Sequence, residues 1–235
     1  MKQVFFILIF QCIFSVTNAQ NANNMYQILT EKETDSVFTD KIKAELGIDY
    51  TIFRAYYYKD LSGEHYLLLT EREYKRQNAE PLNDTIKAFN LKKQEGKLII
   101  DWILRDFIMA KNKADTPEYS IWFWTKYFDL QDFDGDGLID PVIVYGTSGN
   151  NDTEDGRIKI IVYYKGLKHA IRHQNGPLDF ERNTQVDAKF YDLPKQIQVY
   201  VKGLMDKMTE NNNAIFPYGY KEKMDAKKTY FDENK

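Results

Sequence analysis

At its centre the chain reads Asp132-Phe133-Asp134-Gly135-Asp136-Gly137-Leu138-Ile139-Asp140 and continues as Pro141-Val142-Ile143-Val144-Tyr145-Gly146. Four carboxylates this close together repel one another unless a cation lies among them. Calcium takes about six to eight oxygen ligands, and a short acidic loop can supply most of them. Counted from Asp132, the aspartates stand at positions 1, 3, 5 and 9, and the residue at position 7 can offer its backbone carbonyl. The sequence therefore predicts calcium as a cofactor, bound by Asp132, Asp134, Asp136, Leu138 and Asp140.

Strand-forming residues flank this loop. An EF-hand would place a glutamate at position 12, where Ile143 stands, and would continue into a helix. Here β-branched and aromatic residues follow Pro141, and residues 119–130 also favour a strand. Residues 132–146 resemble the FG-GAP calcium hairpin, in which an acidic loop joins two strands. The alternative is a plain acidic hairpin turn, but one Asp-Gly pair would suffice for that.

The N-terminus has the pattern of a secretory signal peptide. Lys2 precedes an apolar stretch over residues 4–16, and Thr17-Asn18-Ala19 supplies small residues before a cleavage site at Gln20. Residues 1–19 are too short for a membrane span. Cys12 raises the alternative of a lipoprotein, but Gln11 is large for the position before a lipidated cysteine. We therefore expect ordinary cleavage and export to the periplasm or the outer membrane, with secretion as the other destination.

Cleavage would remove the single cysteine of the chain, so the mature protein would contain no disulfide and no thiolate metal site. Loss of Lys2 leaves 31 of the 32 basic residues against 35 acidic ones, a net charge near −4. This balance offers no basic patch for nucleic acid. Tyrosine and phenylalanine are frequent, with 17 and 15 copies. Exposed aromatic rings can stack on sugars, although strand and core positions account for most such residues.

Turn residues divide the chain into four hairpins. Residues 51–59 pair with 64–71, residues 85–93 with 97–107, the strands on either side of the aspartates with each other, and residues 157–165 with 167–173. We expect a mainly β, β-rich α+β protein: an antiparallel meander in one domain over residues 20–235, with helices on one side. A propeller of FG-GAP repeats would need several acidic loops. Residues 150–156, with Asp152, Glu154 and Asp155, lack the spacing but could face the metal site.

Helical signals lie towards the two ends of the mature chain. Residues 39–46 predict a short helix that Gly47 ends. Apolar residues recur at helical spacing from Ile197 to Met208, which predicts a C-terminal helix over about residues 194–210. Its polar face is not basic enough to favour a membrane surface. Residues 21–36 are polar and predict loose chain, and residues 216–235 predict an irregular arm.

Signals of catalysis are weak. His169 and His173 would stand about 13 Å apart along a strand, too far for one metal ion. There is no nucleophile elbow and no glycine loop for phosphate. Residues 172–175 with Asp179, Glu181 and Arg182 could line an active or sugar-binding groove. They equally suit a solvated turn with local ion pairs, which the sequence favours because exposed charges need no special role.

A second resemblance covers about residues 120–231. It is carried by the segments 143–149, 155–159, 171–176 and 179–184 and by Lys227-Lys228-Thr229-Tyr230-Phe231. These segments are similar to those of a family of exported Gram-negative proteins labelled as surface polysaccharide biosynthesis proteins. The resemblance implies a role in lipopolysaccharide or other surface polysaccharide, but it carries no catalytic residue to this chain.

Two classes of function follow. The first is a calcium-binding cell-envelope protein that binds a glycan or a partner protein. The second is a periplasmic carbohydrate-active enzyme that uses paired carboxylates such as Asp179 and Glu181. The first is favoured because enzymes concentrate titratable groups in a pocket and the sequence shows no clear group of this kind. The mature chain offers no transmembrane helix by sequence, and its oligomeric state does not follow from the sequence.

Overall fold

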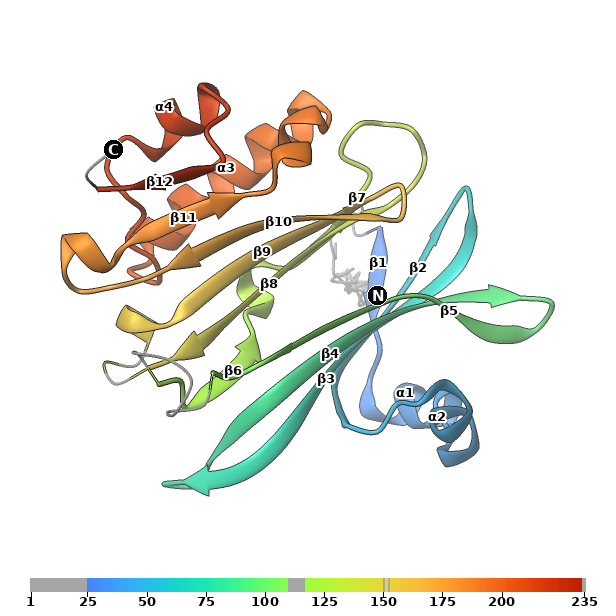
Figure 1. Cartoon of the computed structure of the whole chain (residues 1–235). Coiled ribbons are helices and arrows are strands. Elements are labelled where there is room, and N and C mark those ends of the chain that lie inside the picture. The colour runs from blue at the N-terminus through green and yellow to red at the C-terminus, as the bar shows by residue number, and fades with distance from the viewer. Residues whose placement is uncertain (1–24, 110–116, 150, 152, 234–235) are drawn as a thin grey trace, which may run out of the picture.

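The computed structural model describes residues 25–109, 117–149, 151 and 153–233. The expected signal peptide, residues 1–19, lies outside these ranges. Two antiparallel sheets of five and seven strands dominate the structure, which confirms the mainly β class (Figure 1). Among the described residues, no helix combines the length and the apolar character needed to cross a bilayer.

The five-stranded sheet is a meander in chain order. Its strands are β1 (Tyr26–Ile28), β2 (Thr51–Asp60), β3 (Gly63–Gln77), β4 (Glu80–Gln94) and β5 (Lys97–Phe107). The two hairpins expected here, β2–β3 and β4–β5, are both present. The β3–β4 pairing runs on to Gln77 and Glu80, where Asn78 and Ala79 turn the chain with positive φ. A third hairpin therefore joins the two expected ones into a single sheet.

The seven-stranded sheet has the order β12-β11-β10-β9-β8-β6, and β7 also pairs with β8. Its strands are β6 (Ser120–Phe123), β7 (Asp129–Gln131), β8 (Asp140–Ser148), β9 (Arg157–Tyr164), β10 (Leu167–Gln174), β11 (Asn183–Val186) and β12 (Tyr230–Asp232). The expected hairpin β9–β10 is present. The single strand expected over residues 119–130 is wrong, because a 3-10 turn at Thr125–Tyr127 divides it into β6 and β7.

Four α-helices accompany the sheets in the described residues: α1 (Glu31–Val37), α2 (Asp40–Leu46), α3 (Lys195–Glu210) and α4 (Tyr220–Asp225). Further 3-10 turns span Thr153–Asp155, Asp179–Glu181 and Ala188–Asp192. Helix α2 begins after Thr39, whose side chain accepts a hydrogen bond from the Ile42 N–H. It ends at Gly47, which has φ 65°. Both α2 and α3 confirm the helices expected from the sequence.

Two segments are more ordered than their polar composition predicts. Within residues 25–36, β1 pairs with β2, and α1 begins with a capping box in which Thr30 and Glu33 exchange hydrogen bonds. Near the C-terminus, α4 and β12 replace the expected irregular arm, and β12 adds to the edge of the seven-stranded sheet at β11. In both segments, pairing with a strand far away in the sequence supplies the order.

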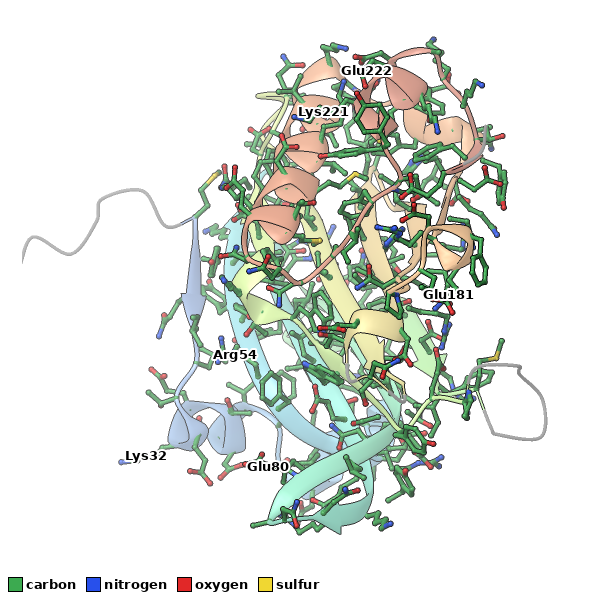
Figure 2. The ribbon with its side chains drawn as sticks, turned by 90° about the vertical axis from the view of Figure 1, so that its left-hand side faces the viewer. Lys32, Arg54, Glu80, Glu181, Lys221 and Glu222 are labelled. Atoms are coloured by element: carbon green, nitrogen blue, oxygen red, sulfur yellow. The ribbon has the colours of Figure 1, made fainter. Side chains whose placement is uncertain are left out.

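Three apolar clusters stack the molecule into layers. The central one joins the two sheets, with Leu67, Leu69 and Ile86 from one and Ile143 and Ile161 from the other. Helix α3 covers the outer face of the seven-stranded sheet, and the N-terminal helices cover the outer face of the five-stranded sheet. Figure 2 shows Lys32 of α1 and Lys221 of α4 far apart. The expectation of helices on one side is wrong, because each sheet has its own outer face to cover.

Candidate metal centre

The aspartate loop, residues 132–140, connects β7 to β8 and is folded by its own carboxylates. Asp132 accepts hydrogen bonds from the backbone N–H groups of Gly135 at 2.7 Å, Asp136 at 3.1 Å and Gly137 at 2.8 Å. Asp134 accepts from Asp136 N–H, and Asp136 accepts from Leu138 N–H at 2.9 Å. Gly135 and Gly137 take φ values of 81° and 83°, which side chains with a Cβ rarely adopt. The loop thus turns around the carboxylates.

Three of the expected ligands converge. One carboxylate oxygen from each of Asp132, Asp134 and Asp136 lies within 4.8 Å of the others, and all three residues are half-buried. A calcium ion bound at about 2.3–2.6 Å from each oxygen fits between atoms at this separation. The structure therefore brings together a group of three aspartates that could hold a metal ion.

Asp140 occupies a different position from the other three. It is 1 % exposed, and one of its oxygens accepts a hydrogen bond from Phe133 N–H at 3.2 Å. Burial first, and then the charges of Asp134, Asp136 and Asp132, raise the pKa of the Asp140 carboxyl to about 7. Asp140 thus lies outside the converging group but within the electrostatic influence of its carboxylates. Leu138, the other expected ligand, donates its N–H to Asp136.

The protein supplies little positive charge to this loop. Lys165 forms an ion pair with Asp136 at 3.1 Å, and its side chain is half-exposed. Tyr164 donates its hydroxyl to Asp134 at 2.9 Å. The N–H of Leu138 and then Lys165 hold the pKa of the Asp136 carboxyl below its usual value. In the described part of the chain, Lys165 is the one lysine or arginine paired with these three carboxylates, so they keep a negative excess.

The β2–β3 turn of the other sheet holds the loop in place. The N–H of Leu61 donates to the carbonyl of Gly137 at 2.9 Å, and the N–H of Ile139 donates to the Asp60 carboxylate at 3.2 Å. The second Asp60 oxygen accepts from Ser62 N–H at 2.7 Å. On the opposite side, the ring of Phe133 lies 4.4 Å from the ring of Tyr200 in α3. Sequence reasoning placed Asp60 in a hairpin turn and missed its link to the loop, for which no local signal exists.

The second acidic segment does not reach the metal centre. Glu154 and Asp155 lie in the 3-10 turn that follows β8, whereas the aspartate loop precedes β8. Nine strand residues separate the two ends by about 30 Å. Asp155 accepts a hydrogen bond from Asn151 N–H at 3.0 Å. The expectation that this segment faces the metal site is therefore wrong for Glu154 and Asp155, and Asp152 lies outside the described residues.

The histidines of β10 are structural. His173 is 2 % exposed, with one ring nitrogen 2.9 Å from the Thr184 hydroxyl and the other 3.2 Å from the Asn175 amide oxygen. Burial lowers the pKa of its imidazole to about 4, so the ring is neutral at physiological pH. His169 is also buried, and burial lowers its pKa too. Neither residue belongs to an acidic or histidine cluster that could hold a metal within the described ranges.

The polar cluster after β10 forms local pairs. Arg172 binds Asp187 at 2.6 Å, and Arg182 pairs with Asp179. The Glu181 carboxylate accepts a hydrogen bond from Leu178 N–H at 3.0 Å, and Glu181 lies at the periphery of the molecule (Figure 2). Arg182 is buried and also pairs with Glu233 near the C-terminus at 3.3 Å, so ion pairs to neighbouring segments as well as local ones hold this turn.

Searches with the sequence and with the structure found no matching family model, no matching curated protein and no matching solved structure.

Proposed function

We propose that this chain is an exported calcium-binding protein of the Gram-negative envelope, periplasmic or associated with the outer membrane. It takes part in surface polysaccharide (lipopolysaccharide) biosynthesis or assembly by binding a glycan or a partner protein. The observation that carries the metal part is the convergence of Asp132, Asp134 and Asp136 within 4.8 Å with a single lysine beside them. The polysaccharide part is supported by the sequence resemblance over residues 120–231.

Calcium suits this loop better than magnesium. The three converging aspartates supply oxygen ligands from a turn only five residues long. In this proposal the carbonyl of Leu138 and the carboxylate of Asp140 add to them. Calcium accepts such a crowded and irregular set, whereas magnesium demands near-ideal octahedral geometry and keeps several waters. Outside the cytoplasm calcium is abundant enough to fill even a weak extracellular site.

The calcium ion would serve structure in this protein. The aspartate loop contacts the β2–β3 turn through Leu61 and Ile139 and contacts α3 through Phe133. Neutralising the loop would therefore strengthen a contact between the two sheets. A calcium sensor needs a pair of helices that can open, and the loop is followed by β8 instead.

A carbohydrate-active enzyme is the less favoured alternative. The carboxylates considered for it, Asp179 and Glu181, bind Arg182 and the N–H of Leu178 within their own turn. Retaining and inverting glycosidases instead direct two carboxyl groups at one scissile bond, about 5–9.5 Å apart. The local pairing of Asp179 and Glu181 supports a binding role over this reaction.

Thermal unfolding tests the metal part. Calcium at about 100 times its dissociation constant stabilises the folded state by about 2.7 kcal/mol, which raises the Tm of a protein of this size by roughly 5–10 °C. The Tm is measured in chelator and in millimolar calcium for three proteins. These are the wild type, a double variant that carries both Asp134→Asn and Asp136→Asn, and the surface control Asp179→Asn. Wild type and control should respond and the double variant should not. A Tm indifferent to calcium and chelator would remove the metal claim.

The polysaccharide part is tested in the cell. Lipopolysaccharide gel profiles are compared for the parent, a deletion strain and a strain carrying Asp134→Ala with Asp136→Ala. An altered profile in the deletion strain, restored by the wild-type copy and not by the double variant, supports both parts together. An unaltered profile in the deletion strain overturns the polysaccharide role while leaving calcium binding untouched.

A further inference from the structure

A pocket lies between the two sheets, directly beside the aspartate loop. Its volume is about 290 Å³, and its walls include His65, Asn90, Lys92, Trp102, Tyr163 and Lys165. Leu138 and Ile139 of the aspartate loop form part of the same lining. Small-molecule sites usually measure about 300–1,000 Å³. A pocket just below this range admits one ring-sized molecule and not an extended chain.

Strand register places the polar groups of the pocket on one face of the five-stranded sheet. Tyr58 of β2 is opposite His65 of β3, and His65 is opposite Lys92 of β4. Side chains directly opposite one another point to the same face. The rings of Tyr58 and His65 stack at 4.8 Å. Tyr58, His65 and Lys92 therefore form one row along the pocket.

A β-bulge shapes the neighbouring wall. Asn90 of β4 pairs with Trp102 of β5 and Leu91 pairs with Ile100, so that Asp101 is the extra residue. Bulges re-aim side chains and are frequent beside functional sites. Asp101 accepts a hydrogen bond from the Asn90 amide at 3.1 Å, and Trp102 stacks on Tyr163 of the other sheet at 3.6 Å. The wall thus combines a flat aromatic pair with a fixed amide and carboxylate.

Two polar groups of the pocket have no partner within the described residues. His65 is 4 % exposed, yet its Nδ1 atom forms no hydrogen bond. Lys92 lies beside His65 in the same row and forms no ion pair among the described residues. Burial lowers the pKa of the His65 imidazole, the charge of Asp60 raises it, and the charge of Lys92 lowers it further. A buried polar atom without a partner costs free energy. The Nδ1 atom is itself inaccessible, so a ligand in the pocket would remove that cost only where the wall shifts to expose it.

The unpaired Nδ1 atom also distinguishes this cluster from a hydrolase triad. Ser62 and Asp60 both approach the same ring nitrogen of His65, Nε2, at 2.8 Å and 3.5 Å. A catalytic triad needs the carboxylate on the nitrogen opposite the nucleophile, so that it holds the correct tautomer. Asp60 is moreover occupied by the N–H groups of Ser62 and Ile139. The pocket is built for binding and not for attack on an ester.

Lys165 connects the pocket to the metal centre. Lys165 belongs to the lining of the pocket, and its ammonium pairs with Asp136 at 3.1 Å. A calcium ion bound to Asp136 competes with that ammonium for the carboxylate charge, so Lys165 becomes free to pair elsewhere. The lining also holds the carboxylates of Asp60 and Asp101, but these accept hydrogen bonds from the chain itself. Lys92 and a displaced Lys165 would have no such partner among the described residues. This arrangement favours a ligand with a negative charge.

We propose that this pocket binds one pyranose residue of a glycan, specifically a residue that carries a carboxylate. Trp102, backed by the stacked ring of Tyr163, would pack against the ring, Asn90 and Asp101 would bind its hydroxyls, and Lys92 and Lys165 its carboxylate. The inference rests on the proposed function, because a glycan is taken as the ligand and calcium as the ion of the loop. It adds the place of binding and the kind of sugar.

Calorimetric titration with monosaccharides tests the proposal. The ligands are galacturonate and galactose, which differ only in the carboxylate, each added in calcium and in chelator. A ligand of about 13 non-hydrogen atoms with ordinary efficiency has a dissociation constant of about 1 mM. In calcium, galacturonate should bind with a dissociation constant of about 1 mM, at least about five times more tightly than galactose. In chelator, galacturonate should bind more weakly than in calcium.

Adjacent lysines provide matched variants. Lys92→Met should weaken galacturonate binding about tenfold, whereas Lys93→Met should leave it unchanged, because Lys93 pairs with Glu64 on the exposed side of β4. An unchanged calcium response of the Tm shows that Lys92→Met remains folded. Equal binding of the two sugars, or equal effects of the two variants, overturns the assignment of the carboxylate. Binding of neither sugar overturns the pocket while a calcium-dependent Tm preserves the metal part of the proposed function.

Discussion

The two ends of the β8–β9 hairpin both carry concentrated acid, but they neutralise it differently. At the end near Ser148, Arg157 binds Glu118 through two nitrogen atoms, and Lys159 pairs with Asp106. At the other end, the three half-buried aspartates of the loop have one ion pair among the described residues, between Asp136 and Lys165. One end is electrically complete within the chain, and the other is short of positive charge.

This difference separates a structural ion-pair network from a candidate metal site. Arg157 also donates to the carbonyl of Phe107, which leaves few donors or acceptors of the network without a partner. The carboxylates of the aspartate loop accept hydrogen bonds from backbone N–H groups, which orient them but add no full positive charge. Clusters of acidic residues are common in proteins. A cluster indicates a metal site when the described lysines and arginines around it are too few to balance its charge.

The largest expected effect concerns the complete end. Glu118→Gln removes the carboxylate that binds the largely buried Arg157 through two nitrogen atoms and leaves Asp106, 3.8 Å away, as its remaining anion. Breaking such a pair costs about 3 kcal/mol of unfolding free energy. Urea unfolding should show the same loss in calcium and in chelator. The exposed pair of Arg76 and Glu73 supplies the control, because Glu73→Gln should cost less than about 0.5 kcal/mol. If the loss of unfolding free energy in Glu118→Gln differed between calcium and chelator, the two ends of the hairpin would be energetically coupled, and the contrast drawn between them would be wrong.

The next effect is a pH dependence at the aspartate loop of metal-free protein. The pKa of Asp140 is raised to about 7, above its unfolded value near 4, so the folded state binds the proton more tightly. This contribution to stability is present below about pH 4 and is lost as the pH rises through 7. Between about pH 5 and pH 7 the loss amounts to about 2 kcal/mol.

Asp140→Asn isolates this contribution, because its side-chain oxygen can still accept from Phe133 N–H while no carboxylate titrates. Urea unfolding in chelator should show a flatter pH profile for the variant than for the wild type. In calcium, the wild-type profile should also flatten. If the variant and the wild type in chelator share one slope, the pKa of Asp140 is not raised.

The smallest effect concerns Lys165. The substitution Lys165→Met removes the ammonium that competes with calcium for the Asp136 carboxylate. Calcium affinity should therefore rise about two- to fivefold at low salt. In chelator the variant should be slightly less stable, since the aspartates lose their one ion pair. Lys168→Met, at an exposed position of β10, is the control. Weaker calcium binding by Lys165→Met would mean that Lys165 orients the loop and does not compete with the ion.

Local elements of this fold could be predicted because their signals are local. The β2–β3 hairpin follows from strand formers on each side of the turn at residues 60–63, and α2 lies between an N-cap at Thr39 and a glycine at Gly47. Helix α1 could have been found too, since Thr30 and Glu33 have the spacing of a capping box. The polar composition of residues 21–36 concealed it.

The division into two sheets could not be predicted. The alternation of apolar and polar residues along a strand shows that Leu67 and Ile143 each belong to a buried face. It does not show that these two faces pack against each other. The contact of Asp60 with Ile139 joins residues that no sequence spacing relates. Within the loop, spacing placed Asp132, Asp134 and Asp136 together. It could not show that Asp140, the first residue of β8, turns its carboxylate into the interior.

The hydrogen bond between Ile139 and Asp60 spans 79 residues of chain. Contacts at such separation form late in folding, because the intervening chain must lose its entropy first. The aspartate loop is anchored to the β2–β3 turn only at that stage, so a cation that strengthens this anchoring changes the rate of unfolding far more than the rate of folding. If calcium binds as proposed, it would thus set how long each molecule stays folded, and so how long it resists proteases, and would leave the time needed to fold almost unchanged.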